Sequence, residues 1–172
     1  GPIIAEMAEK LKIVNCKLKI SLPRPMMYTR DYDFSFSGLK TAVLYEFQSR
    51  SPKIRKSRQY IQEMCHEIQQ SIIDVLIWKT LKAAKDFKVK SVILGGGVSA
   101  NGELRKKFGL KIENCPSVLS SGSKDKLKIE FLVPPKILCT DNAAMVAVTA
   151  YFHRNEASKN WQKVEANANL RT

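Results

Sequence analysis

The sequence predicts an α/β fold in which helices pack on a sheet. Two apolar, strand-like segments, at 92–94 and 129–141, each lead through a short polar or glycine-rich loop into a helical pattern. A long stretch with helical periodicity, residues 58–88, precedes both of them. Strands and helices that alternate in this way are typical of α/β domains. We therefore expect a sheet flanked by helices, one of them long.

The first half of the chain predicts mainly helix. Residues 3–10 indicate a short helix, and residues 12–25 indicate extended segments that end in a turn bracketed by Pro23 and Pro25. Ser37 and Gly38 precede an apolar-periodic run, which is typical of a loop that leads into a helix. Residues 50–58 are expected to form a basic linker.

The strongest local pattern is the stretch 58–88. Its apolar residues recur at helical spacing from Ile61 to Leu76, so one helix of about 40 Å is expected at 1.5 Å per residue. Lys79, Lys82 and Lys85 are expected on the side away from the apolar residues.

The second half alternates strands and helices. A buried strand at Val92–Leu94 leads into a glycine loop and a helix. Residues 114–128 are rich in serine and lysine and predict a flexible insertion. One or two strands are expected around Pro134 and Pro135, then a helix of small apolar residues from Asn142 and an extended tail over 158–172.

Composition limits the class of protein. The 172 residues carry 29 Lys and Arg against 16 Asp and Glu, a net charge of +13. With 44% hydrophobic residues the chain is too apolar for a disordered basic tail. The four cysteines show neither CxxC spacing nor a Cys/His ligand pair, which argues against a zinc framework, and with no secretory segment a disulfide scaffold is not expected either. No apolar run reaches the length of a bilayer crossing, so a cytoplasmic protein without a membrane partner is expected.

The first candidate site is the loop LGGGVSAN. Gly95, Gly96 and Gly97 follow a strand directly, and glycines let backbone N–H groups approach an anionic ligand closely. Asn101 stands at the start of the next helix, where its side chain could bind a ligand. The simpler alternative is a tight turn in which Asn101 only caps the helix.

The second candidate site, CTDNAAM, has the same design. Thr140, Asp141 or Asn142 could cap the following helix, whereas Asp141 could instead bind a hard metal ion or orient a polar ligand. Both loops follow strands, which is where α/β proteins bind nucleotides. His66 and His153 lack partners of ligand character at helical spacing, and no catalytic set can be assigned.

Basic residues gather at 53–58, 79–90, 105–107 and 124–128. Distributed charge of this kind suits phosphate contacts with nucleic acid, although each cluster alone could be a solvated face.

Three segments carry a resemblance to a known family: DFSFSGLKT (33–41), GGGVSANGELR (95–105) and CTDNAAMVA (139–147). Their wording, order and rough spacing resemble the TsaD family of tRNA threonylcarbamoyltransferases, formerly called O-sialoglycoprotein endopeptidases, and the first segment its bacterial and organellar branch. The opening GPIIAEMAEK resembles the family's GGPxIxxLA segment, so Gly1 and Pro2 are either native or a remnant of cloning.

The resemblance implies an actin-like, Hsp70-like ATPase fold related to ribonuclease H, with a nucleotide between two lobes. The family transfers a threonylcarbamoyl group from threonylcarbamoyl-adenylate to the exocyclic amine of the adenosine next to the anticodon of tRNA. By motif, Asp141 matches a metal ligand, and Asn101 and Gly1 match substrate-binding residues. Gly95–Gly97 match the backbone wall against the adenylate. One divalent ion, iron or zinc, and accessory subunits of the modifying complex are implied as well.

The family's HxxxH metal ligands, its upstream glycine loop and a ribose-contacting Asp are missing from the sequence. Residues 1–172 therefore look like the C-terminal lobe of a two-lobed enzyme, inactive alone, without the N-terminal lobe. A non-catalytic RNA- or partner-binding module of the same fold is the alternative, and a sugar-kinase lobe of the same superfamily is a third. If the source is eukaryotic, a mitochondrial or plastid location replaces the cytoplasm.

Overall fold

The computed structural model describes residues 1–11, 18, 20–113 and 129–156. Backbone contacts divide the chain into two units, Gly1–Cys139 and Thr140–Thr172. The first contains α1 (Pro2–Glu9), α2 (Ser37–Ser49), α3 (Pro52–Arg55), α4 (Arg58–Asp86), β1 (Ser91–Ile93), the 3₁₀ turn η2 (Gly97–Ala100), α5 (Gly102–Glu113), β2 (Glu130–Leu132) and the 3₁₀ turn η4 (Lys136–Leu138). The second contains α6 (Ala143–Phe152) and the 3₁₀ turn η5 (Arg154–Glu156).

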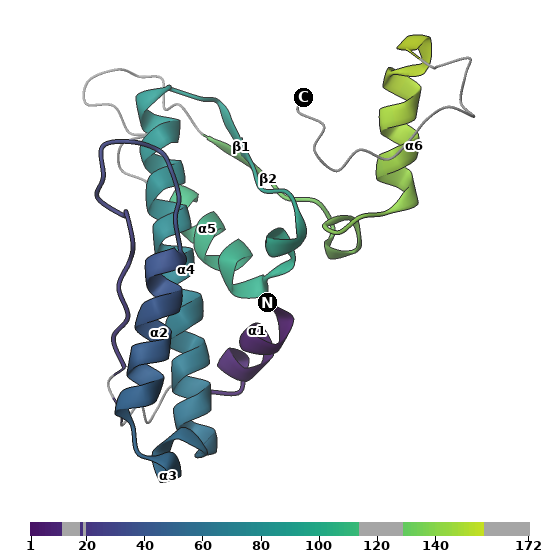
Figure 1. Cartoon of the computed structure of the whole chain (residues 1–172). Helices are drawn as coiled ribbons and strands as arrows, with labels where there is room; N and C mark the ends of the chain where they lie inside the picture. Colours follow the sequence, from purple (N-terminus) through teal and green to yellow (C-terminus); the bar gives the residue numbers. More distant parts are fainter. Residues whose placement is uncertain (12–17, 19, 114–128, 157–172) are drawn as a thin grey trace. The chain divides into compact units, whose positions relative to one another are not determined.

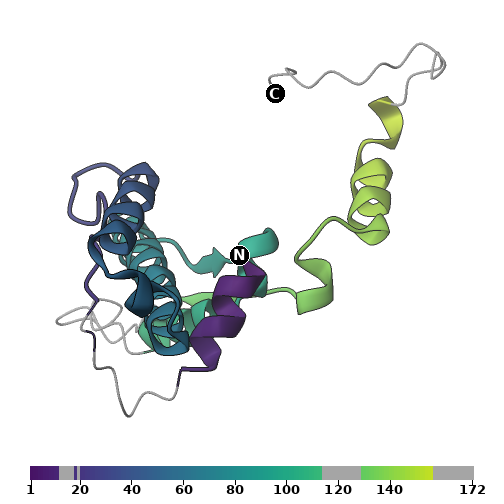
Figure 2. The same cartoon turned by 60° about the horizontal axis from the view of Figure 1, so that its bottom comes forward.

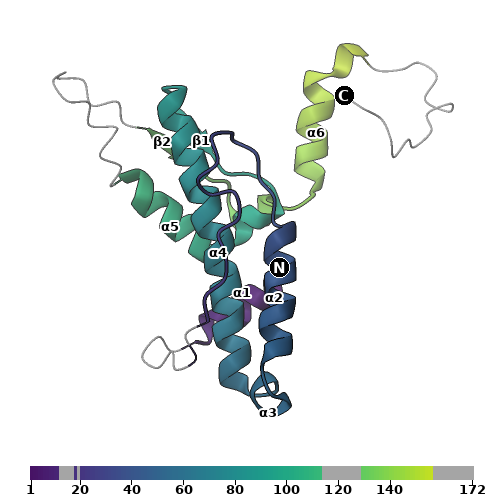
Figure 3. The ribbon, with the colours of Figure 1, turned by 60° about the vertical axis from the view of Figure 1, so that its left-hand side comes forward.

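Helix α4 is the central element of the first unit (Figure 1). It has 29 residues and is about 43 Å long at 1.5 Å per residue. The Ser57 side chain caps its start by accepting a hydrogen bond from the Tyr60 amide at 3.3 Å. Helix α1 contacts α4 (Figure 2), and Figure 3 shows α2 and α5 beside different parts of it.

Two separate groups of buried side chains pack against α4. In its N-terminal half, Tyr60 and Met64 of α4 pack with Leu39 of α2 and with Leu22 of the segment before it. In its C-terminal half, buried side chains of α4 pack with side chains of β1 and α5: Ile73, Ile77 and Ala84 from α4, Val92 from β1, and Leu104, Phe108 and Ile112 from α5. Helix α4 therefore contributes apolar side chains to both buried groups, one along each half of its length.

The described sheet has two parallel strands, β1 and β2, paired with Val92 opposite Phe131. Val92 is buried, and Phe131 stacks on Phe108 of α5 with ring centroids 5.2 Å apart. Ile93 and Leu132 lie on the other face and are exposed. Helices joined to a parallel pair of strands agree with the predicted α/β class.

Several sequence-based expectations need correction. The predicted linker over 50–58 contains a short helix, α3, because the Ser51 side chain accepts from the Ile54 amide and Pro52 occupies the first helical position. Of the one or two strands expected around Pro134 and Pro135, the described residues form one, β2, which is followed by a 3₁₀ turn over Lys136–Leu138. Proline has no N–H to donate to a sheet, which explains this break.

Other expectations are met or lie outside the described residues. The predicted long helix over 58–88 is confirmed as α4. Ser37 and Gly38, expected in a loop before a helix, are instead the first two residues of α2. The proposed insertion at 114–128, the tail at 158–172 and most of the extended segment at 12–19 lie outside the described residues. None of the helices in the described parts has the length and hydropathy that a bilayer crossing requires.

Candidate functional site

The glycine loop connects β1 to α5 and has a defined conformation. Gly96 has a φ of +79°, which strongly favours glycine, and its carbonyl accepts hydrogen bonds from the Ser99 amide at 3.0 Å and the Ser99 hydroxyl at 2.6 Å. A Cβ added at Gly95 or Gly97 would meet nothing within 4 Å, and neither has a positive φ. Of the three glycines in this loop, only Gly96 is therefore required by its backbone conformation.

Asn101 caps α5, as the simpler sequence interpretation predicted. Its Oδ1 accepts the Leu104 amide at 2.9 Å, and its Nδ2 donates to Oε1 of Gln69 on α4 at 2.8 Å. Gln69 is buried, so this contact ties the glycine loop to the middle of the long helix. An asparagine amide offers two N–H groups and two oxygen lone pairs, so one of each stays available for a ligand.

Arg105 stabilises the glycine loop through hydrogen bonds of its side chain. Its Nε donates to the Ser99 carbonyl, and its Nη2 donates to the Pro134 carbonyl at 2.7 Å and to Sγ of the buried Cys139 at 2.9 Å. These bonds join the glycine loop to the segment after β2. Nε and Nη2 of Arg105 are thus used within the chain, which leaves Nη1 as the part of the guanidinium without a bond to a described residue.

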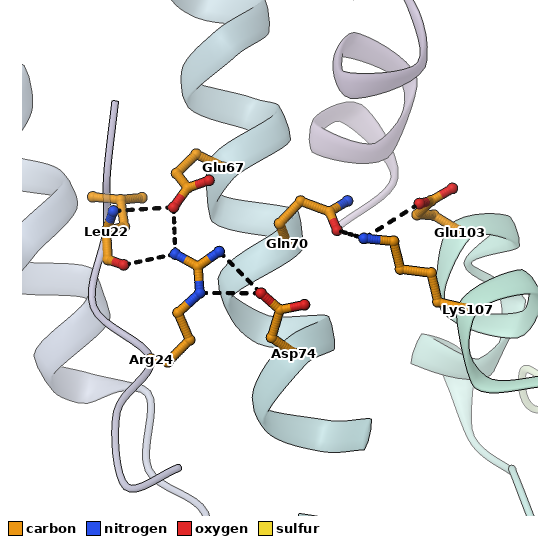
Figure 4. Close-up of polar contacts among 7 residues, drawn as sticks. All are labelled: Leu22, Arg24, Glu67, Gln70, Asp74, Glu103 and Lys107. Atoms are coloured by element: carbon orange, nitrogen blue, oxygen red, sulfur yellow. Dashed lines mark hydrogen bonds and ion pairs between the residues drawn. The ribbon is translucent and has the colours of Figure 1, made fainter. Parts of the chain in front are cut away.

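Lys107 is likewise held by neighbouring side chains (Figure 4). Its Nζ donates to Oε1 of Gln70 and lies 3.7 Å from Oε1 of Glu103. Of the predicted cluster at 105–107, Lys106 alone is fully exposed without such a contact among the described residues.

A segment over residues 20–36, here called the strap, lies along α4. Near its start, Arg24 donates through Nε and Nη2 to Oδ2 of Asp74 at 3.1 and 2.9 Å, and through Nη1 to Oε1 of Glu67 (Figure 4). The same Glu67 oxygen accepts the Leu22 amide at 3.1 Å, and Arg24 Nη1 donates to the Leu22 carbonyl at 2.8 Å. The planar guanidinium thus binds two carboxylates that lie about two helical turns apart on α4.

Farther along, the strap is bound by Lys79. Its side chain is fully buried, and Nζ donates to Thr29 Oγ1 and Asp31 Oδ1, each at 2.8 Å, and to the Asp33 carbonyl. These donors hold the pKa of the Asp31 carboxyl at about 2, with the Lys79 hydrogen bond as the main cause. The prediction that Lys79 faces away from the apolar side of the helix is wrong.

Two more contacts fix the end of the strap. Lys82 Nζ donates to the Arg30 carbonyl at 2.6 Å and lies 4.6 Å from the centre of the Tyr32 ring. The Tyr32 hydroxyl donates to Oδ2 of Asp86 at 2.8 Å, and this bond raises the pKa of the phenol. These bonds fix the strap at Arg30 and Tyr32, just before the segment 33–41, which contains the start of α2.

Asp141, in the second unit, is exposed and is not the cap of α6. That role belongs to Asn142, whose Oδ1 accepts the Met145 amide at 2.9 Å and whose Nδ2 donates to the Thr140 carbonyl at 2.8 Å. Of the three residues that could cap the helix, Asn142 is therefore the one that does so, which leaves the Asp141 carboxylate free of this task.

The described residues do not form a metal centre by themselves. Within them, no three His, Cys, Asp or Glu side chains lie together so that they could hold an ion. Zinc sites typically use about four ligands, and catalytic ones about three from the protein. Asp141 supplies a single carboxylate, so the described residues offer one ligand for the implied ion and not a complete site. Gly1 is exposed at the start of α1, and no atom lies within 4 Å of its would-be Cβ.

Arg24, Gln69 and Lys79 are the residues that sequence analysis missed. Arg24 had a signal, because it stands between two prolines in a segment singled out as a turn. Lys79 had one too, because it continues the apolar series Ile72 and Val75 at helical spacing. Nothing local marks Gln69, whose partner lies 32 residues away.

Comparisons with known proteins agree among themselves. The TsaD family model, described as tRNA N6-adenosine threonylcarbamoyltransferase, matches residues 1–148. A protein of that name from Thermosipho africanus is 39% identical over 153 residues, which cover 89% of this chain and 42% of the relative. Those from Desulfotalea psychrophila and Geobacillus kaustophilus are 41% and 40% identical over 154 and 148 residues, covering 88% and 86% of this chain and 40% and 38% of the relatives. The chain thus spans about two fifths of these relatives' length.

Proposed function

Because the chain belongs to the TsaD family of tRNA N6-adenosine threonylcarbamoyltransferases, we propose that it is part of an enzyme that modifies tRNA. The group transferred is threonylcarbamoyl, the donor is threonylcarbamoyl-adenylate, and the acceptor is the exocyclic amine of the adenosine next to the anticodon. The observation that carries this proposal is the family match over residues 1–148. Residues 1–172 would form the C-terminal lobe, of actin-like fold, in the cytoplasm and with accessory subunits.

The glycine loop is the proposed contact with the adenylate. Neither the backbone conformation nor a neighbouring atom requires a glycine at positions 95 and 97. A ligand that approaches the backbone closely would require one, because it leaves no room for a side chain. Amide N–H groups of such a loop bind phosphate oxygens. Asn101 would contact threonylcarbamoyl-adenylate through the amide N–H and the oxygen lone pair that its bonds to Gln69 and Leu104 do not use.

In the proposed reaction the amine nitrogen of adenosine attacks the carbonyl carbon of the threonylcarbamoyl group. A carbon–nitrogen bond forms, the bond from that carbon to the phosphate oxygen breaks, and AMP leaves while the amine loses a proton. The contribution of this chain is positioning and charge stabilisation at the glycine loop. No residue is proposed as general base.

Asp141 is proposed as one ligand of a divalent ion, iron or zinc, whose other ligands would come from outside the described residues. Asn142 caps α6 and leaves the Asp141 carboxylate available, which supports this assignment. In the full-length gene product, Asp141→Ala is expected to lower bound metal, measured by elemental analysis, and to abolish modification. Asn142→Ser keeps a capping side chain and should retain both. Full metal content in the Asp141→Ala protein would contradict the assignment.

A modification assay tests the activity itself. The full-length gene product, unmodified tRNA and threonylcarbamoyl-adenylate are combined, and threonylcarbamoyladenosine is quantified by mass spectrometry of digested tRNA. The full-length protein, with its accessory subunits, is expected to form the product, and residues 1–172 alone are expected to form none. A full-length protein that binds tRNA but never forms product would favour the non-catalytic binding module.

A further inference from the structure

The turn that joins α2 to α4 concentrates positive charge. Residues 47–62, here called the basic tip, contain five basic residues and no Asp or Glu: Arg50, Lys53, Arg55, Lys56 and Arg58. The other described basic cluster of similar length, 79–90, differs, because Lys79 is buried, Lys82 is bonded to the strap, and Asp86 lies among the lysines. The basic tip is therefore the described stretch with the least internal compensation of charge.

Two of the five cations hold the tip together. Arg50 pairs with Oε1 of Glu46 at 2.7 Å, and Arg55 donates through Nε to the Arg50 carbonyl at 2.7 Å. The Arg55 guanidinium also lies 5.2 Å from the centre of the Phe47 ring. Lys53, Lys56 and Arg58 are exposed and form no ion pair with another described residue.

The three free cations stand on a folded turn. Ser51 accepts the Ile54 amide at the start of α3, and the Ser57 hydroxyl donates to the Ile54 carbonyl at 2.8 Å while it caps α4. Backbone positions at 52–58 are thus fixed by hydrogen bonds before any partner arrives. A polyanion that binds here does not have to order this backbone, which removes part of the entropic cost of association.

Aromatic side chains lie on the adjoining helix. Tyr45 and Phe47 of α2 are 66% and 43% exposed. Cations beside exposed aromatic rings are the combination by which proteins bind RNA, with phosphates on the cations and unpaired bases on the rings. Exposed rings also occur at protein–protein interfaces, so the choice of RNA as the partner rests on the tRNA that the proposed function supplies.

We propose that the basic tip is an RNA-binding surface, with Lys53, Lys56 and Arg58 as its phosphate contacts. The proposal rests on the proposed function, because that function supplies a tRNA as the polyanion. It extends that function, since it says which part of the first unit touches the RNA backbone. The contacts are electrostatic and independent of sequence, so they add affinity and orientation to the tRNA rather than specificity.

The test measures binding of a fluorescein-labelled, unmodified tRNA transcript to the full-length gene product between 50 and 200 mM NaCl. The variant K53Q/K56Q/R58Q removes three phosphate contacts, so the slope of log affinity against log salt should fall by about 2–3. Over this salt range, that reduces the loss of affinity by roughly 20- to 40-fold. The charge-matched control K85Q/K88Q/K90Q changes three exposed lysines of the other cluster and should keep the wild-type slope.

Two further comparisons make the result decisive. The charge-retaining variant K53R/K56R/R58K should bind as wild type, and its failure to do so would overturn a purely electrostatic contact. Equal loss in both glutamine variants would show an effect of net charge alone, and unchanged binding in the tip variant would leave an acidic protein as the partner; either result overturns the proposal. Wild-type modification is measured in parallel, so activity without a tip effect refutes this surface while the proposed function stands.

Discussion

The ammonium group of Lys79 lies 2.8 Å from the carboxylate of Asp31, across 48 residues of sequence, with the lysine side chain fully buried. Thr29 and the Asp33 carbonyl accept its other hydrogen bonds. One side chain of α4 thereby fixes the strap just before the segment 33–41, whose wording resembles the family. The Asp31–Lys79 contact is therefore structural, and it holds the start of the segment 33–41 against α4.

The Asp31–Lys79 pair predicts an acid-sensitive part of stability. The pKa of Asp31 is lowered from its ordinary value to about 2, chiefly by the Lys79 hydrogen bond, so the ionised form is favoured in the folded state. This contribution is fully present above about pH 4 and is lost as the pH falls toward 2. Urea unfolding of the wild type and Asp31→Asn across this range should show the difference between them shrinking with acid. A constant difference would contradict the assignment.

Arg24→Lys tests whether the strap depends on the guanidinium shape. A lysine keeps the charge but cannot bind Glu67 and Asp74 with the same planar set of donors, so a loss of about 1–3 kcal/mol in the free energy of unfolding is expected. Arg30→Lys, at an exposed arginine of the same strap, should change it by less than about 0.5 kcal/mol. Similar losses in both variants would contradict a specific role of the Arg24 guanidinium.

Phe108→Ala tests the packing between α5 and the sheet. Phe108 is 2% exposed and stacks on Phe131, so its truncation should lower the free energy of unfolding by about 3–5 kcal/mol. Leu110→Ala, on the same helix but 49% exposed, should cost far less. Chemical denaturation of both variants checks the contrast, and equal costs would mean that the buried group does not include α5.

Asn101→Ser separates the capping role from the proposed contact with the donor. Serine also caps helices well but lacks the amide that donates to the buried Gln69, so Asn101→Ser should lower the melting temperature less than Asn101→Ala, which loses the cap as well. Serine lacks the amide, so KM for threonylcarbamoyl-adenylate in the full-length enzyme should rise about tenfold or more if a hydrogen bond worth 1.4 kcal/mol is lost. An unchanged KM with a lowered melting temperature would leave Asn101 with its structural role alone.

Local patterns predicted what depends on local chemistry. The extent of α4 followed from apolar spacing, the cap at Asn101 from residue type and position, and the family assignment from three motifs, which the match over 1–148 confirms. The Arg24 and Lys79 contacts join residues about 50 positions apart, and single-chain periodicity carries no information about such pairs. The same limit applies to Arg105, whose acceptors include the Pro134 carbonyl 29 residues away, which the sequence does not reveal.

The bond from Asn101 to Gln69 attaches the start of α5 to the buried middle of α4. If loop and helix separated there, the buried Oε1 of Gln69 would lose its donor, which costs free energy. The end of the glycine loop is therefore anchored to the interior of the first unit and is not a free surface excursion.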